Sequence, residues 1–99
     1  MKVFWTETAV QHLSAIYAYI AQNSPKYAER TIDRLTRRSQ QIATFPLSGR
    51  VVPEFSTEQI REVIESSYRI IYYIKAEQID ILAVLHGSQQ ITPSEDFSE

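Results

Sequence analysis

The sequence predicts a two-layer α+β domain in which a helical hairpin covers one face of a single sheet. Three observations predict it: a short aromatic strand at residues 2–5, two amphipathic helical segments separated by "NSP", and three β-branched segments close together near the C-terminus. With 99 residues and 43% hydrophobic content, the chain suffices for one domain with its own core. We expect that domain at residues 1–92 and an acidic, flexible tail at residues 93–99.

The N-terminal half predicts a strand and two helices. "KVFW" at residues 2–5 is aromatic and β-branched and stops at Thr6, a favourable helix N-cap. Apolar residues then recur at spacings of three and four over residues 7–22, which is typical of a helix with one buried stripe. Ser24 and Pro25 predict the start of a second helix, which continues to about residue 43, because serine caps a helix and proline suits its first position.

The C-terminal half predicts a loop and an antiparallel meander. "FPLSGRVVPEFSTEQ" contains two prolines and a glycine, so it predicts a loop with a short extended piece at Val51 and Val52. Strands are predicted at residues 60–64, 68–75 and 79–86, and their separators "ESS" and "AEQ" have the length of hairpin turns. The two-helix crossover should place "KVFW" parallel to one of these strands.

Side-chain alternation predicts which residues share each face of the sheet. In the middle strand of the meander, one face carries Tyr68, Ile70, Tyr72 and Ile74, and the other carries Arg69, Ile71, Tyr73 and Lys75. The last strand is apolar on both faces, with Ile79, Ile81, Ala83 and Leu85 opposite Leu82 and Val84. It is therefore predicted to be the central strand. One sheet face should pack on the helices, and the uncovered face is a candidate partner site.

Composition argues against several classes of function. The chain has no cysteine and only two histidines, so we expect no disulfide, no thiol chemistry, no metal site and no cofactor. It has no apolar run of membrane-spanning length and no signal peptide, which predicts a cytoplasmic protein without a membrane partner. The net charge of −2 argues against an electrostatic nucleic-acid binder.

Four segments, in order and at suitable spacing, resemble the RelE/ParE superfamily of toxins from type II toxin–antitoxin modules. They are "FWTETAVQHLSAIYAYIA", "FPLSGRVVPEF", "IREVIESSYRIIYYI" and "IDILAVLHGSQQI", and the resemblance extends from about residue 3 to residue 91. "SGRVVPE" and "LHG" are more similar to the ParE branch than to the RelE branch. The resemblance implies a RelE/ParE-like fold with the N-terminal strand, helical hairpin and three-stranded antiparallel meander in one sheet.

The resemblance also implies partners and activity. The ParE branch is associated with inhibition of DNA gyrase, and the RelE branch cleaves messenger RNA on the ribosome. We therefore expect a gyrase-binding toxin, with growth inhibition and plasmid stabilization as its biological effects and no enzymatic activity of its own. A cognate antitoxin is implied as the neutralising partner. The toxin could form a homo-oligomer, or a hetero-oligomer with the antitoxin. A RelE-like endoribonuclease, with the ribosome or messenger RNA as its target, is the alternative.

A third alternative is an inactive relative that binds only its antitoxin. Relatives often carry arginine three positions after the histidine of "LHG", where this chain has Gln89. Without that arginine, a catalytic His86 would lack the cation expected near a phosphate.

The candidate site residues depend on which activity is present. For a binding toxin, the target contacts are expected from a basic and aromatic set: Arg50, Arg61, Arg69, Tyr72 and Tyr73. For an endoribonuclease, Arg61 and Arg69 would hold the phosphate, and His86 or a tyrosine would transfer protons. Structural roles remain open: nearby carboxylates can pair with the arginines, Arg50 can anchor its loop, and His86 can fix the turn after its strand.

The second predicted helix carries an arginine ridge. Arg30, Arg34 and Arg38 follow one another at spacings of four, so their side chains stack on one side of the helix. Such a ridge suits acidic residues of the antitoxin, and a solvated polar face is the alternative interpretation.

Overall fold

The computed structural model describes residues 1–87 and residue 89. The predicted boundary between residues 92 and 93 and the predicted acidic tail lie outside the described residues. The elements follow in the order β1 (Lys2–Trp5), α1 (Glu7–Ala21), α2 (Pro25–Thr44), the 3-10 helix η1 (Pro46–Ser48), β2 (Arg50–Val51), β3 (Ile60–Glu65), β4 (Tyr68–Ile74) and β5 (Gln78–His86). Each predicted helix and strand is present, with boundaries that shift by at most one residue.

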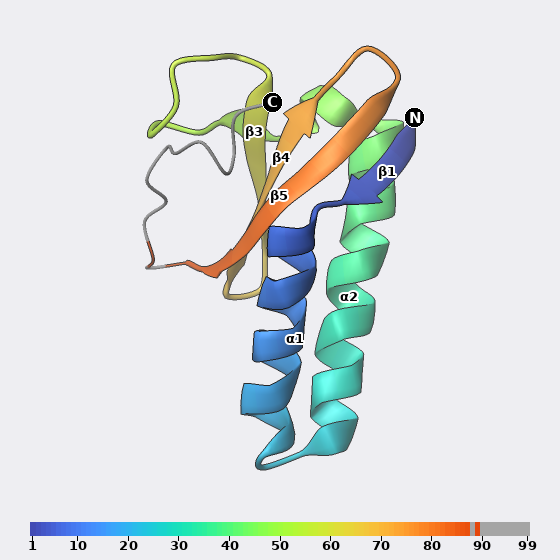
Figure 1. Cartoon of the computed structure of the whole chain (residues 1–99), viewed down its shortest axis with the longest axis vertical. Helices are drawn as coiled ribbons and strands as arrows, with labels where there is room; N and C mark the ends of the chain where they lie inside the picture. The colour runs from blue at the N-terminus through green and yellow to red at the C-terminus, as the bar shows by residue number, and fades with distance from the viewer. Residues whose placement is uncertain (88, 90–99) are drawn as a thin grey trace.

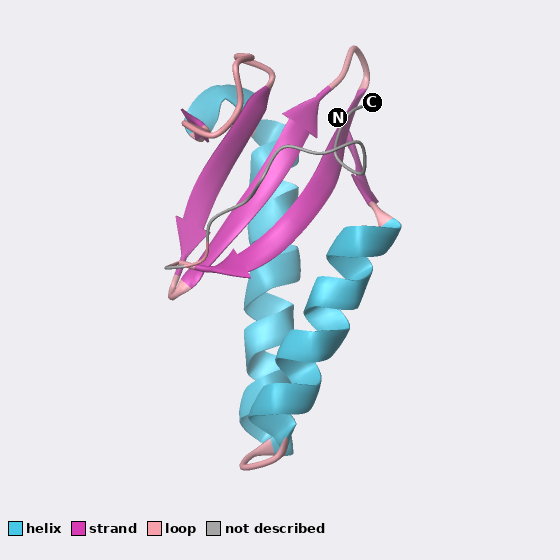
Figure 2. Cartoon of the chain, turned by 60° about the vertical axis from the view of Figure 1, so that its left-hand side comes forward, coloured by secondary structure: helices cyan, strands magenta, loops and turns pink. Residues whose placement is uncertain are grey.

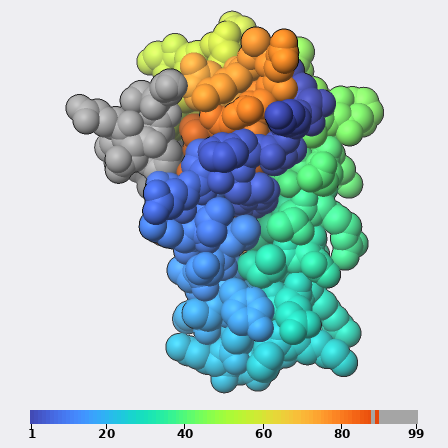
Figure 3. Space-filling model, turned by 45° about the vertical axis from the view of Figure 1, so that its right-hand side comes forward, coloured from blue at the N-terminus to red at the C-terminus, as the bar shows by residue number. Residues whose placement is uncertain are grey.

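The molecule has two layers, as the sequence predicts. The α1–α2 hairpin packs on one face of the sheet and extends well beyond it, so its far half forms one end of the molecule (Figures 1 and 2). Figure 3 shows the two helices lying side by side over this lower half. No helix in the described chain has both the length and the apolar character that a membrane span needs.

The sheet has five strands in the order β1-β5-β4-β3-β2. The meander β3–β4–β5 is antiparallel, and β1 pairs in parallel with β5, as predicted. Strands β1 and β2 form the two edges of the sheet, because the helical hairpin carries the chain from β1 at one edge to β2 at the other. Strand β5 has neighbours on both sides, but β4 occupies the centre, so the prediction that the last strand is central is wrong. Strand β5 is apolar on both faces because the helices cover one face and the loop between β2 and β3 packs on the other.

Capping residues fix where the helices begin. The Thr6 hydroxyl accepts a hydrogen bond from the N–H of Ala9 at 3.2 Å and donates one to the carbonyl of Ile81 at 2.7 Å. Thr6 therefore caps α1 and ties its start to β5. Ser24 caps α2 by accepting from the N–H of Tyr27 at 3.1 Å, with Pro25 at the first helical position.

Two apolar clusters lie on opposite faces of the sheet. The cluster on the helix side contains Leu35 and Ile42 from α2 and the strand residues Ile70, Tyr72 and Val84. The second cluster lies on the face that carries no helix, which we call the open face; it comprises Val52, Ile60, Ile71, Leu82 and Ala83, with Phe55, Tyr73 and Leu85 packed against them. The loop between β2 and β3 contributes the Phe55 contact, so the open face is partly covered by a loop.

The predicted alternation of β5 is wrong in its second half. The register with β4 shifts between Ile71 and Tyr72, so that β5 carries one extra residue at this point. Such a β-bulge reverses the face that the following side chains occupy. As a result Ile79 and Ile81 share the helix side with Val84, whereas Leu82, Ala83 and Leu85 pack on the open face.

Candidate functional site

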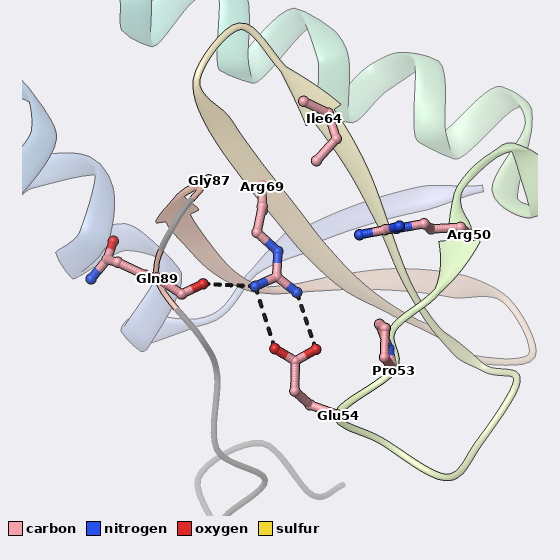
Figure 4. A pocket seen from close by; sticks show the side chains of 7 residues that line it. All are labelled: Arg50, Pro53, Glu54, Ile64, Arg69, Gly87 and Gln89. Atoms are coloured by element: carbon pink, nitrogen blue, oxygen red, sulfur yellow. Dashed lines mark hydrogen bonds and ion pairs between the residues drawn. The ribbon is translucent and has the colours of Figure 1, made fainter.

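The open face carries a cluster of two arginines and two glutamates. The Glu62 carboxylate is fully buried and accepts hydrogen bonds from Nε of Arg50 at 2.5 Å and from Nε of Arg69 at 2.7 Å. Arg69 also donates to the Glu54 carboxylate at 3.2 Å and to the main-chain oxygen of Gln89 at 2.8 Å (Figure 4). We call Arg50, Glu54, Glu62 and Arg69 the open-face ion cluster.

A shallow cavity of about 430 Å³ lies over this cluster, lined by Arg50, Pro53, Glu54, Ile64, Arg69, Gly87 and Gln89. Burial opposes the charged form of Arg69, but the hydrogen bonds to Glu62 and Glu54 and their negative charges outweigh it and raise the pKa of Arg69 above its ordinary value. The guanidinium of Arg69 therefore stays charged and cannot act as a general acid. Two carboxylates balance the two arginines, so the cavity offers an incoming anion little net attraction.

The candidate catalytic residues do not converge. Directly paired residues on antiparallel strands share a sheet face. Arg61 pairs with Tyr72 and His86 pairs with Tyr68, and both tyrosines belong to the helix side, whereas Arg69 faces the open side in the cavity. The structure therefore separates Arg61 from Arg69 by the thickness of the sheet, and it corrects the prediction that the two hold one phosphate together.

Tyr72 is a core residue, which corrects its place among the target contacts. Its side chain has no exposed area, and burial raises its pKa above the ordinary value. The hydroxyl donates to the carbonyl of Pro46 at 2.6 Å and accepts from the N–H of Gly49 at 3.1 Å. Arg61 helps to hold the same segment, because it donates to the carbonyls of Gly49 at 2.9 Å and Glu58 at 3.0 Å.

The remaining candidates lie nearer the surface. The Arg50 side chain is 67% exposed although it pairs with Glu62. Tyr73 is half-buried on the open face, with the Lys75 ammonium 5.9 Å from its ring centre. His86 is exposed at the end of β5, and its ring contacts the edge of Tyr68 at a centroid distance of 6.0 Å. Arg69, at 6% exposure, is buried except where it lines the cavity.

An apolar groove lies where the end of the sheet meets α1. Its volume is about 390 Å³, and it is lined by Ala15, Ile16, Tyr19, Tyr68, Val84, His86 and Gln89. Burial raises the pKa of Tyr68, and the nearby Tyr27 and Tyr19 raise it further, so three tyrosines gather at this end of the sheet. Tyr19 is 75% exposed and Tyr27 is 50% exposed. We call this feature the tyrosine groove.

The arginine ridge on α2 borders the same end of the sheet. Arg38 and Arg34 lie 3.5 Å and 4.0 Å from the carboxylate of Glu65, at the end of β3. The neighbouring Arg37 pairs with Asp33 at 4.0 Å. Arg30, a full turn before Arg34, is exposed. Glu65 thus neutralises part of the ridge and braces the sheet against α2, while Arg30 leaves positive charge at the surface.

His12 fills a role that the sequence did not reveal. Strand β1 ends at Trp5, opposite Ile81, so α1 instead of a strand lies along the remaining outer edge of β5. There the His12 ring accepts the N–H of Val84 through Nδ1 at 3.1 Å. Burial lowers the pKa of His12, which favours the neutral ring that this bond requires. The described residues contain no cluster of three or more His, Cys, Asp and Glu able to hold a metal ion.

Comparison with known proteins identifies the family. Residues 3–91 match the model of the family described as the ParE toxin of type II toxin–antitoxin system, parDE. The chain belongs to the ParE toxin family. This ParE-family toxin is 33% identical over 89 residues to the putative toxin Y4kP of Sinorhizobium fredii (strain NBRC 101917 / NGR234), covering 90% of this chain and 91% of the relative.

Two further likenesses agree with this assignment. The toxin RelE2 of Caulobacter vibrioides (strain ATCC 19089 / CIP 103742 / CB 15) is 34% identical over 89 residues, which cover 89% of this chain and 97% of that one. A solved chain of the chromosomal ParDE TA system from P. aeruginosa has the same fold, with a TM-score of 0.71 at 21% identity over 87% of this chain and 95% of that one. This ParE-family protein is thus the toxin of a type II toxin–antitoxin system, which implies an antitoxin partner.

Proposed function

We propose that this toxin inhibits DNA gyrase by binding to it, that it does so in the cytoplasm, and that a cognate antitoxin neutralises it. Growth inhibition, and through it plasmid stabilization, would be the biological effects. The observation that carries the proposal is the open-face ion cluster. Its arginines are occupied by Glu62 and Glu54, so the cavity over the sheet is not prepared to stabilise a developing negative charge.

The endoribonuclease alternative has one observation in its favour, the relative named toxin RelE2. The geometry supports it less well. Cleavage through a ribose hydroxyl needs cations and an acid–base pair at one phosphate. Arg61 bonds to carbonyls on the helix side, Arg69 bonds to carboxylates on the open side, and His86 contacts Tyr68. These groups do not surround one position.

The alternative of an inactive relative depended on Gln89. In the structure the main-chain oxygen of Gln89 accepts from Arg69, and its side chain accepts from the N–H of His86 at 2.7 Å. Gln89 therefore has a structural role at the end of β5, and a binding toxin has no need of a phosphate-binding cation here.

Target contacts are proposed at the exposed cations and the half-buried tyrosine. Of the predicted set, Arg50, Arg61 and Tyr73 reach the surface and remain candidates, whereas Arg69 and Tyr72 are buried. Arg50 pairs with Glu62 on the open face, whereas Arg61 lies on the helix side, so the two arginines flank the same edge of the sheet from opposite faces.

The test is a supercoiling and DNA-cleavage assay with purified gyrase, ATP and titrated toxin free of antitoxin. Inhibition of supercoiling, or trapped cleaved DNA, is expected. Supercoiling that continues unchanged at a large excess of folded toxin would rule the proposal out. Sequencing transcripts after toxin induction supplies the contrast, because new transcript ends are expected only from the endoribonuclease alternative.

For the antitoxin, we propose that an amphipathic segment covers the tyrosine groove while acidic residues meet the arginine ridge. An exposed aromatic groove, together with the exposed Arg30 of the ridge, fits a segment that combines apolar and acidic side chains. Tyr19→Ser should weaken antitoxin binding by about tenfold, as loss of an aromatic anchor commonly does. A titration of antitoxin against wild-type and variant toxin measures this, and equal affinities would place the docking site elsewhere.

A further inference from the structure

The turn between α2 and β2 has an unusually well-bonded backbone. We call residues Phe45 to Gly49 the Phe45–Gly49 turn. The N–H of Phe45 donates to the main-chain carbonyl of Gln41, and the carbonyl of Phe45 accepts from the N–H of Ser48 at 3.0 Å. The hydroxyl of the buried Tyr72 holds both Pro46 and Gly49. Core side chains therefore fix a segment at the surface of the molecule.

Glycine is required for this contact. A Cβ at position 49 would lie 2.5 Å from the Tyr72 hydroxyl and 2.6 Å from the carbonyl oxygen of Glu62. These separations are far below ordinary van der Waals contact, so only glycine lets the turn approach the sheet this closely. Arg61 closes the arrangement through its bond to the Gly49 carbonyl.

The fixed backbone presents two large apolar side chains to solvent. Phe45 is 66% exposed and Leu47 is 70% exposed, and Val51 in the adjoining β2 is 39% exposed. In Figure 3 the green segment that follows α2 projects from the upper right-hand edge of the molecule. Exposed apolar side chains gain free energy when a partner covers them, and a rigid backbone reduces the entropy lost on binding.

Positive charge flanks these side chains. The Arg50 side chain follows the turn and is 67% exposed, but its charge is offset by Glu62, so Arg61 is the main source of positive charge beside the turn. Arg61 contacts the turn directly and, within residues 1–87 and 89, has carbonyls and no carboxylate as partners. The complementary surface is therefore apolar at its centre and acidic at its rim. Of the two exposed side chains only Phe45 could stack on a base, and the aromatic and aliphatic pair suits an apolar protein pocket better than a nucleic acid.

The turn lies far from the tyrosine groove. Strand β4 begins at Tyr68, in the groove, and has nearly ended at Tyr72, which holds the turn. The two surfaces therefore lie at opposite ends of the central strand, with η1 at the top in Figure 1 and the end of β5 lower down. A partner in the groove would leave the turn accessible to another protein.

We propose that the Phe45–Gly49 turn is a protein-docking site at which Phe45 and Leu47 enter an apolar pocket on an acidic surface of the toxin's target protein. The inference rests on the proposed function in assigning the partner as the target and not the antitoxin. It adds a contact surface that the predicted site residues did not include, and it gives Tyr72 and Arg61 the role of positioning residues that hold the turn.

The test compares Phe45→Ser/Leu47→Ser with the matched control Phe4→Ser, which removes a 53% exposed phenyl ring from β1, at the sheet edge opposite β2. Each protein is induced in bacterial cells at equal soluble level, and growth arrest is scored against inducer concentration. The double variant should need at least about tenfold more protein for the same arrest, since each lost anchor weakens binding. Phe4→Ser should arrest growth as the wild type does.

Three other outcomes would overturn the inference, and a fourth would reject gyrase as the target while keeping the docking site. Arrest by the double variant equal to that by the wild type would show that the turn does not contact the target. Retained arrest combined with escape from the antitoxin would make the antitoxin the occupant. New transcript ends produced by the wild type but not by the double variant would make RNA the partner. If the double variant loses growth arrest but the wild type does not affect gyrase, the docking site is supported and only gyrase is rejected as its partner.

Discussion

Internal hydrogen bonds have opposite consequences in the open-face ion cluster and in the Phe45–Gly49 turn. In the cluster, the buried Glu62 draws the charges of Arg50 and Arg69 inward and neutralises them. In the turn, Tyr72 and Arg61 satisfy the backbone and leave Phe45 and Leu47 pointing into solvent. Charged residues that look functional in the sequence thus serve the fold, and a segment that looks like an ordinary loop carries the surface suited to a partner.

Removing the shared carboxylate should have the largest effect on stability. Glu62→Leu leaves the buried Arg69 with Glu54 as its carboxylate partner and the Gln89 carbonyl as a further acceptor, and breaking a buried ion pair from one side costs about 3–5 kcal/mol. Chemical denaturation of the variant and the wild type measures this difference in the free energy of unfolding. A change below about 1 kcal/mol would mean that solvent already screens the pair.

The matched control removes both partners. Glu62→Leu/Arg69→Met should recover most of the lost stability, because replacing a buried ion pair by apolar side chains is often neutral or stabilising. Arg50 can turn to solvent, since its side chain is already 67% exposed. A double variant as unstable as the single variant would indicate that Glu62 matters through contacts other than the ion pair.

Adding a methyl group under the turn should have an intermediate effect. Gly49→Ala forces the Tyr72 hydroxyl and the Glu62 backbone away from the new Cβ, and overpacking of this kind costs about 1–3 kcal/mol. Gly87→Ala is the comparison, because its nearest atom would be the Ser67 carbonyl oxygen at 3.2 Å. Thermal unfolding of both variants should show the larger loss for Gly49→Ala, and the opposite order would contradict the close packing of the turn.

Protonation of His12 should give the smallest effect. Burial lowers its pKa below the ordinary value of 6.5, so the unfolded chain binds this proton more readily than the folded chain. The stability contributed by the neutral ring is therefore present above about pH 6.5 and is lost as the pH falls through the folded-state pKa. The free energy of unfolding, measured at several pH values across this range, should depend less on pH for His12→Gln than for the wild type. Equal pH dependence in the two proteins would show that His12 does not contribute.

Much of the fold follows from local sequence signals. Thr6, Ser24 and Pro25 mark the helix starts because capping depends on neighbouring residues alone. The β-bulge in β5 gave no such signal, since Leu82 and Ala83 are both apolar and suit either face. The pairing of Arg69 with Glu54 and Glu62 also escaped prediction, because it depends on how the loop between β2 and β3 crosses the open face.

The candidate site was less predictable than the fold. Alternation along β4 already places Tyr72 and Tyr73 on opposite faces, yet it does not say which face the helices cover. Burial of Tyr72 became evident only once the helix-side cluster was placed. His12 differs again, because its role depends on β1 ending at Trp5 and exposing the edge of β5, a consequence of register.

The central claim is that Arg69 stabilises the fold and that the toxin acts by binding its target. The most direct measurement is growth arrest and gyrase inhibition by the folded variant Glu62→Leu/Arg69→Met, alongside the wild type at equal soluble level. We predict that both proteins arrest growth and inhibit supercoiling at the same concentration. A folded double variant that no longer arrests growth would show that Arg69 acts on the target or its phosphates, and would contradict the account.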